Sequence, residues 1–142
     1  MEAKTSELIG PALDWVVAKI LSETAPFHDT VASWWFTIDG KSRTTASGWA
    51  QALNPSTNWA HGWPILDREG ISVWRSLYPE EGLWCAAPCE YTTTTLDEFE
   101  QRVDDDDMQS PIHGPTPLIA AMRCYVASNL GEEVEIPEEV LK

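Results

Sequence analysis

Two tryptophans four residues apart lie in a segment rich in hydroxyl and amide side chains. Trp59 and Trp63 fall within residues 54–64, which have no hydrophobic periodicity and contain many turn-forming residues. An indole offers a flat apolar face for stacking and one N–H donor. An aromatic surface with a few polar groups is typical of a small-ligand site. The segment therefore predicts a ligand site formed by these two tryptophans with Ser56, Thr57, Asn58, His61 and Arg68.

The same residue types also fit a loop that binds no ligand. Ser, Thr and Asn side chains commonly hydrogen-bond to their own backbone in turns. Arg68 stands between Asp67 and Glu69, where it can form a solvated ion pair. Residue types alone slightly favour this second interpretation. The ligand hypothesis requires Trp59 and Trp63 to stand over a hollow open to solvent instead of filling the core.

No pattern in the sequence predicts catalysis or a metal centre. Neither a Gly-Xaa-Ser-Xaa-Gly motif nor a phosphate-binding P-loop occurs, and no spacing predicts a Cys–His nucleophile pair. A zinc site at Cys85 and Cys89 would need a second ligand pair, which Cys124 and the three histidines do not supply. We therefore expect reduced cysteines, no cofactor, no metal and no enzymatic activity.

The chain is strongly acidic, because 9 Lys and Arg against 23 Asp and Glu give a formal charge of −14. This charge opposes direct nucleic-acid binding and association with anionic membranes. Seven acidic residues lie in a predicted loop at 97–107, and five lie in a predicted extended tail at 132–142. Such carboxylates can be merely solvated. They can also mimic a phosphate backbone, so the alternative function is an inhibitor that contacts a protein through Asp104, Asp105, Asp106 and Asp107.

The elements that must position these residues are those of a single α+β domain spanning 1–142. Apolar periodicity predicts two main helices, at about 11–23 and at 117–130, packed against a small and mostly antiparallel sheet. Thr116 is the expected N-cap of the second helix. Thr5 is a plausible N-cap of the first, whose regular part is expected to start only after Gly10. Strands are expected at 34–38, at 91–95 and in a hairpin of 71–74 with 83–86, a short helix at 96–103 and a surface loop at 41–51.

Tryptophan is unusually frequent, with eight residues, none of them after position 84. Trp74, Trp84 and one of the pair Trp34 and Trp35 lie in strand-like runs and are expected in the core. Trp15 is expected at the edge of its helix's apolar stripe. No apolar run approaches the roughly 18–20 residues that span a bilayer, and the first residues lack the pattern of a signal peptide. These observations predict an intracellular protein.

Three segments together resemble a known family. The first is 4–8 together with 12–18. The second is 55–71, which includes Asn58-Trp59-Ala60-His61-Gly62-Trp63-Pro64, and the third is 114–128, which begins Gly114-Pro115-Thr116-Pro117. They are similar to the NinX-like family, small proteins of tailed bacteriophages and prophages first noted among accessory genes of lambda-like phages. The family usually reads Gln-Gly-Gly-Pro where this chain has His61-Gly62-Trp63-Pro64, so a large ring stands in place of bare backbone.

The resemblance implies a phage accessory protein made in the cytoplasm of a bacterial host. Small phage accessory proteins often counter host defences, either by binding a defence protein or by sequestering a nucleotide signal. The sequence therefore predicts a non-enzymatic binder of a small, nucleotide-like ligand at the tryptophan segment. The alternative partner is a host defence protein that binds the acidic segments. Exposed tryptophans also favour interfaces, so a homodimer is compatible with the sequence.

Overall fold

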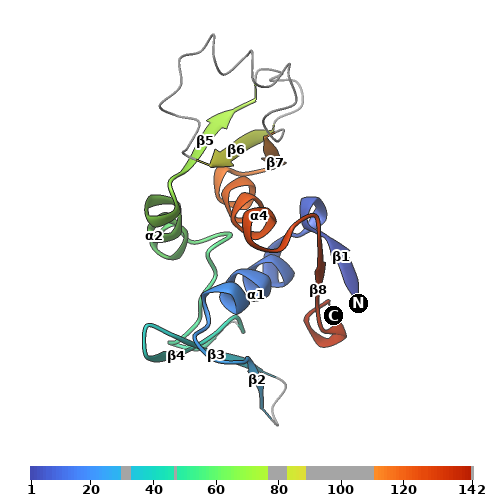
Figure 1. Ribbon diagram of the computed structural model, residues 1–142. Coiled ribbons are helices and arrows are strands. Elements are labelled where there is room, and N and C mark those ends of the chain that lie inside the picture. The colour runs from blue at the N-terminus through green and yellow to red at the C-terminus, as the bar shows by residue number, and fades with distance from the viewer. Residues whose placement is uncertain (30–32, 47, 77–82, 89–110, 142) are drawn as a thin grey trace.

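The structure is a computed structural model that describes residues 1–29, 33–46, 48–76, 83–88 and 111–141. Within these residues it has three α-helices and three small antiparallel sheets, which confirms the predicted α+β class. Figure 1 shows α1 (Gly10–Leu21) and α4 (Pro117–Leu130) together in the middle of the molecule, with a sheet at each end. The central pair of helices, α1 and α4, thus lies between the sheets.

The two predicted main helices are present. α4 has the predicted bounds: the Thr116 hydroxyl accepts a hydrogen bond from the Ile119 N–H at 3.1 Å, and Gly131, at a φ of 88°, ends the helix. α1 ends at Leu21 instead of residue 23. Thr5 does not cap it, because Thr5 belongs to a separate turn, η1 (Thr5–Glu7), and its hydroxyl donates to the Gly131 carbonyl at 2.7 Å.

A third helix, α2 (Trp59–Glu69), begins in the turn-rich segment 54–64, from which the sequence predicted no helix. That prediction was wrong because the turn-forming residues act as helix ends. The Asn58 side chain accepts a hydrogen bond from the Ala60 N–H at 2.9 Å, and Gly70, at a φ of 63°, ends the helix. Pro64 removes one N–H inside the helix, but burial of Ile65 and Leu66 stabilises it.

One sheet has the order β2 (Phe27–His28), β3 (Trp34–Ile38) and β4 (Lys41–Thr44). The strand predicted at 34–38 is confirmed, and positive φ values at Asp39 (52°) and Gly40 (72°) form the tight turn between β3 and β4. The predicted loop at 41–51 was wrong in its first four residues. They form a polar strand because ladder hydrogen bonds come from the backbone and do not require apolar side chains.

A second sheet contains the predicted hairpin, here β5 (Ile71–Arg75) and β6 (Trp84–Pro88), followed by β7 (Ile112–Gly114). It packs on α4 through a small cluster of Ala86, Ala120 and Cys124. Gly114 permits this contact, because a Cβ there would lie 2.6 Å from the Ala120 nitrogen. The helix and the sheet therefore approach backbone to backbone.

The acidic tail that the sequence predicted as extended is extended only in its first part, where it forms a third sheet. β8 (Glu133–Glu135) pairs with β1 (Glu2–Lys4), and a short helical turn, η4 (Glu138–Leu141), follows. Val134 and Ile136 are buried, so alternate apolar residues hold this segment to the core while the carboxylates point outward. Figure 1 shows the two termini close together on this side of the molecule.

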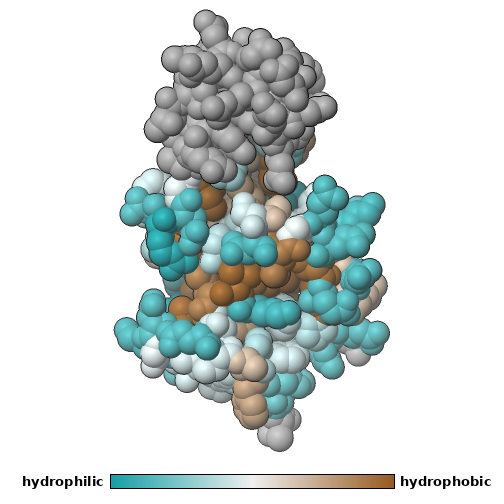
Figure 2. Space-filling model, in the orientation of Figure 1, coloured by the Kyte–Doolittle hydropathy of each residue, from teal (hydrophilic) through white to brown (hydrophobic). Residues whose placement is uncertain are grey.

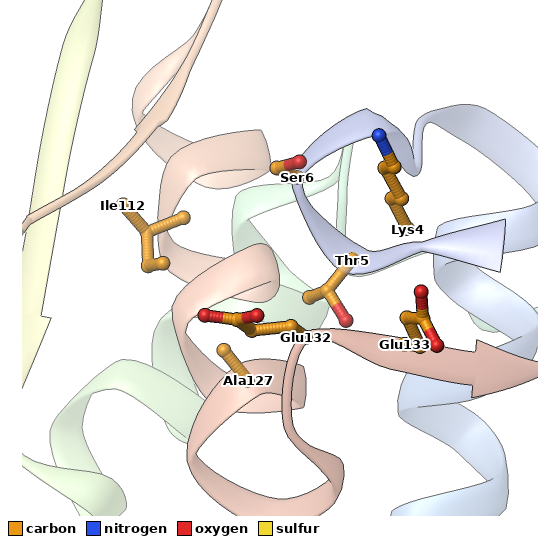
Figure 3. A pocket seen from close by; sticks show the side chains of 7 residues that line it. All are labelled: Lys4, Thr5, Ser6, Ile112, Ala127, Glu132 and Glu133. Carbon is orange, nitrogen blue, oxygen red and sulfur yellow. The ribbon is translucent and has the colours of Figure 1, made fainter.

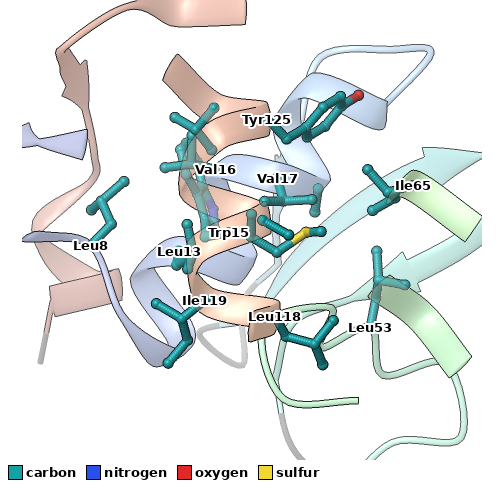
Figure 4. Packing of buried hydrophobic residues seen from close by; sticks show 14 of the residues in the cluster. Leu8, Leu13, Trp15, Val16, Val17, Leu53, Ile65, Leu118, Ile119 and Tyr125 are labelled. Atoms are coloured by element: carbon teal, nitrogen blue, oxygen red, sulfur yellow. The ribbon is translucent and has the colours of Figure 1, made fainter. Parts of the chain in front are cut away.

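The main core lies between α1 and α4, as Figure 4 shows. Trp15, expected at the edge of an apolar stripe, is 3% exposed and belongs to this core. Trp34 and Phe36 of β3 cover it, with ring centres 5.5 and 6.1 Å away. Trp74, Trp84 and one of the pair Trp34 and Trp35 were expected in the core, but all four are only half-buried. Figure 2 shows apolar residues across the middle of one face, over the helical centre.

Arg123 of α4 ties distant parts of the chain together. Its Nε donates to the Leu8 carbonyl at 2.8 Å, and one terminal nitrogen donates to the His113 carbonyl at 3.0 Å. Burial lowers the pKa of this guanidinium from its usual value. The side chain therefore satisfies two backbone carbonyls that precede α1 and α4.

Several predictions lie outside the described residues: the strand at 91–95, the helix at 96–103, the acidic loop at 97–107 with Asp104, Asp105, Asp106 and Asp107, and Cys89. In the described part of the chain, no helix is both long and apolar enough to span a membrane.

Candidate functional site

The two tryptophans of the ligand hypothesis project from the first two turns of α2. Trp59 is the first helical residue, and Trp63 follows four positions later, so both side chains share one face of the helix. Trp59 is 48% exposed and Trp63 is 57% exposed. Neither ring fills the core, but the hypothesis also requires both rings to stand over a hollow, and Trp63 lines none of the three clefts described below.

Trp59 lines a cleft of about 240 Å³ where the first turns of α2 and α4 meet. Two residues that precede α2, Ser56 and Thr57, also line it. The rest of the lining comes from the start of α4, namely Thr116, Pro117, Leu118 and Ile119. The cleft thus combines an aromatic ring, three hydroxyl-bearing residues and aliphatic side chains, a composition suited to a small amphipathic ligand.

Gly62 allows the two helices to come together here. A Cβ at this position would lie 2.6 Å from Leu118 Cδ2 and 2.6 Å from the Pro55 carbonyl oxygen. Leu118 itself belongs to the core cluster with Leu53 and Ile65, as Figure 4 shows. Only a residue without a side chain permits this approach, so Gly62 sets the width of the cleft.

The segment before α2, which forms one wall of the cleft, is held in place by a hydrogen bond to α1. The buried Asp14 carboxylate accepts a hydrogen bond from the Ser56 N–H at 2.8 Å, across 42 residues of sequence. Burial raises the pKa of Asp14, and the Ser56 contacts partly oppose that shift. Asp14 therefore positions Ser56 and does not itself line the cleft.

A family model described as bacteriophage P22, NinX matches residues 4–129, which include α1, α2, all but the last residue of α4 and every residue that lines the cleft. The chain belongs to the phage NinX family. No curated protein sequence matches the chain. The resemblance seen at the level of sequence is thus confirmed as family membership.

The NinX motif around α2 has a physical explanation in this fold. The resemblance places a family glycine at Gly62, where a side chain would collide with Leu118 and Pro55. Trp63, which replaces a second glycine, is 57% exposed, so its large ring points away from the packed side of the helix. Trp63 therefore adds an aromatic surface without disturbing the close contact of Gly62 with Leu118 and Pro55.

The polar residues predicted as ligand contacts take part in local structure. Asn58 caps α2. His61 Nδ1 lies 3.1 Å from the Asn54 backbone nitrogen and 2.9 Å from Asn54 Oδ1, and burial, with the nearby Arg43, holds the pKa of His61 below its usual value. Thr57 Oγ1 accepts from Asn54 Nδ2 at 3.3 Å. Of the seven predicted residues, only Ser56, Thr57 and Trp59 line the cleft.

Arg68 lies apart from the tryptophans. It is nine residues after Trp59 on α2, which places it on the opposite face of the helix. Its Nε is 3.1 Å from the Glu69 carboxylate, as predicted for an exposed ion pair. Arg68 also contacts Tyr125, where it counteracts the rise in the Tyr125 pKa caused by burial. Its described contacts therefore lie away from the cleft.

Two other clefts in the described chain offer different chemistry. One, of about 340 Å³, lies beside β1 and β8 and is lined by residues that include Lys4, Glu132 and Glu133 (Figure 3). Another, of about 370 Å³, is lined by residues of β1, by residues between Glu7 and Ala12, and by Val140. Neither contains an aromatic side chain. Stacking is thus available, among these three clefts, only beside Trp59.

No cluster of three or more His, Cys, Asp or Glu side chains suited to a metal is found among the described residues. Burial raises the pKa of the Cys124 thiol to about 11, so this sulfur is protonated at neutral pH. Cys124 is therefore a packing residue of the small cluster under β6 and does not carry a reactive thiolate.

Proposed function

We propose that this NinX-family protein is a non-enzymatic phage accessory protein, which counters a host defence in the bacterial cytoplasm by binding a small, nucleotide-like ligand. The observation that carries the proposal is the position of Trp59. Trp59 is about half exposed to solvent and lines a cleft next to hydroxyl-bearing residues. A nucleobase could stack on this ring while its polar substituents reach the cleft.

Stacking of a base on an aromatic side chain contributes about 1–3 kcal/mol. Trp63 lies on the same face of α2 and extends the aromatic surface beyond the cleft. In this proposal Trp59 and Trp63 provide the apolar contact and Thr57 provides a polar contact, while the buried Ser56 only shapes the wall of the cleft. Asn58 and His61 act indirectly, because they fix the start of α2.

The test is a thermal-unfolding screen of nucleosides, nucleotides and cyclic nucleotides against the full chain. A ligand present at 100 times its Kd should stabilise the protein by about 2.7 kcal/mol. Trp59→Ala should weaken binding at least about fivefold, the lower limit for lost stacking. Trp49→Ala is the matched control, because Trp49 is similarly exposed, at 46%, but does not line the cleft.

Two results would refute the proposal: no compound stabilises the chain, or Trp59→Ala binds the hit as tightly as the Trp49→Ala control. The formal charge of −14 favours one other function, an acidic inhibitor of a host defence protein that acts through Asp104, Asp105, Asp106 and Asp107. In that case no nucleotide shift is expected, and binding to the protein target should weaken as salt rises.

A further inference from the structure

We infer that the outer face of the β2–β3–β4 sheet is a docking surface for an arginine-bearing segment of a partner protein, whose cationic side chain contacts Trp35 and Trp49. The inference is independent of the nucleotide proposal, because no residue of this sheet lines the cleft beside Trp59. Its evidence is a cluster of exposed aromatic rings, the position of the sheet's own basic residues and the charge of the chain.

The sheet has one face packed on the core and one aromatic face turned away from it. Figure 1 shows the sheet at one end of the molecule, next to α1. Trp34 and Phe36 of β3 cover Trp15 of α1. Because alternate residues of a strand point to opposite faces, Trp35 between them points outward. Phe27 of β2 lies directly opposite Trp35 in the ladder and is 65% exposed, so the outer face carries two adjacent aromatic side chains.

A third ring comes from the segment that follows β4. The rings of Trp35 and Trp49 have their centres 5.2 Å apart and their planes at 78°, and Trp49 is 46% exposed. The Trp35 Nε1–H donates to Asp29 Oδ2 at 2.7 Å. The other oxygen of this carboxylate accepts a hydrogen bond from the Ser33 N–H at 2.9 Å. The two indoles therefore form a fixed corner with a carboxylate at its edge.

A corner of two nearly perpendicular indoles is suited to a cation. The face of an aromatic ring attracts an ammonium or guanidinium group, and several rings around one cation form an aromatic cage. The chain makes such a contact elsewhere, where Lys19 Nζ lies 5.6 Å from the centre of the Trp15 ring. Within the described residues, no cation lies over Trp35 or Trp49. These two rings can therefore accept a cation from a partner.

The basic residues of the sheet belong to its other face. Lys41 of β4 lies opposite Ile38, on the side packed against the core. Arg43 lies opposite Phe36 on the same side and donates to two backbone carbonyls of the segment after β4. The His28 ring lies against a tryptophan of that face, with ring centres 4.8 Å apart. None of these three side chains is therefore placed to repel a cation at the outer face.

The charge of the chain selects the kind of partner. A formal charge of −14 attracts a basic segment and repels both nucleic acid and a second copy of the chain. Arginine fits better than lysine, because its planar guanidinium stacks on aromatic faces. Tryptophan and arginine are also among the residues most enriched at interface hot spots. These arguments together favour an arginine-bearing protein segment.

The test measures the binding of two short peptides to the full chain by calorimetry and by ¹H–¹⁵N NMR. One peptide alternates glycine and arginine, and the other has glutamine in place of each arginine. We expect the arginine peptide to bind with an affinity that falls as salt rises, and the glutamine peptide to bind far more weakly. The arginine peptide should shift the indole N–H signals of Trp35 and Trp49.

Trp49→Ala separates the ring contact from general attraction to an acidic chain, because it leaves the net charge unchanged. It should weaken binding of the arginine peptide about two- to thirtyfold, the range expected for one cation–π contact. Trp49→Phe should retain part of the affinity, and Phe27→Ala, at a second exposed ring of this face, should also lower it. Leu130→Ala, at a 45% exposed residue of α4, is the matched control and should leave the affinity unchanged.

Several results would overturn the inference. They are an unchanged affinity in both Trp49→Ala and Phe27→Ala, equal binding of the two peptides, or shifts confined to indoles other than Trp35 and Trp49. A dimer in sedimentation that Trp49→Ala dissociates would make a second copy the occupant of this face. Binding of single-stranded oligothymidylate that Trp49→Ala weakens would make nucleic acid the occupant. None of these measurements reports on nucleotide binding beside Trp59, so the two proposals stand or fail separately.

Discussion

Substitution of Gly62 by alanine should push α2 away from α4 and open the cleft. The added Cβ would lie 2.6 Å from Leu118 Cδ2 and 2.6 Å from the Pro55 carbonyl oxygen. Carbon atoms in contact are normally about 3.5–4.0 Å apart, so one of the groups must move by about 1 Å. The Leu118 methyl can rotate, but the Pro55 oxygen belongs to the backbone and moves only with its whole segment.

The expected magnitude is the difference between two opposing effects. Overpacking of a close contact costs about 1–3 kcal/mol. Alanine in place of glycine inside a helix contributes up to about 1 kcal/mol in the other direction. We therefore expect Gly62→Ala to lower the free energy of unfolding by about 1–2 kcal/mol, in spite of its better helix propensity.

Urea denaturation of the wild type, Gly62→Ala and Ala60→Gly measures this balance. Ala60 is exposed in the first turn of the same helix, so its substitution reports the propensity difference without the packing contact. The nucleotide affinity should fall in Gly62→Ala, because the walls of the cleft separate. A variant as stable as the wild type, with unchanged affinity, would refute the close-contact argument for this glycine.

Three further predictions concern the elements that hold the site. The raised pKa of Asp14 means that the native state favours its protonated form, so wild-type stability relative to Asp14→Asn should improve as pH falls from 7 toward 4; parallel denaturation curves at several pH values check the sign. Thr116→Ala should cost about 1 kcal/mol, because α4 loses its N-cap, and Thr116→Asn should restore most of it in the same urea assay. Arg123→Met should cost about 2–3 kcal/mol, because two backbone carbonyls lose a charged donor, whereas Arg68→Met, at an exposed ion pair, should cost less than about 1 kcal/mol by thermal unfolding.

The elements whose signals are local could be predicted from the amino-acid sequence. α4 has a capping threonine, a proline at its first position, a continuous apolar face and a terminal glycine, and its bounds were predicted correctly. β3 and its turn, and the hairpin of β5 and β6, follow from β-branched and aromatic runs next to turn residues. Such signals suffice because the hydrogen bonds and caps involved lie within a few residues of each other.

α2 shows where local signals conflict. The segment around it contains turn formers and an internal proline, and these indicated a loop. Asn58 and Gly70 could have been read as the two ends of one helix, with Ile65 and Leu66 on its buried side. Burial against the core decided in favour of the helix, because its free energy outweighs the weak propensities of these residues.

The cleft was decided by tertiary structure alone. The hypothesis named Trp59, Ser56 and Thr57 from their residue types, but the other wall comes from the start of α4, almost 60 residues later. His61 and Arg68 share the segment with Trp59, yet the helical period turns them to the other side of α2. The sequence shows which residues can donate a hydrogen bond, offer an aromatic ring or cap a helix. Which of them share a cleft depends on how closely α2 and α4 approach at Gly62, and that distance is set by packing across the chain.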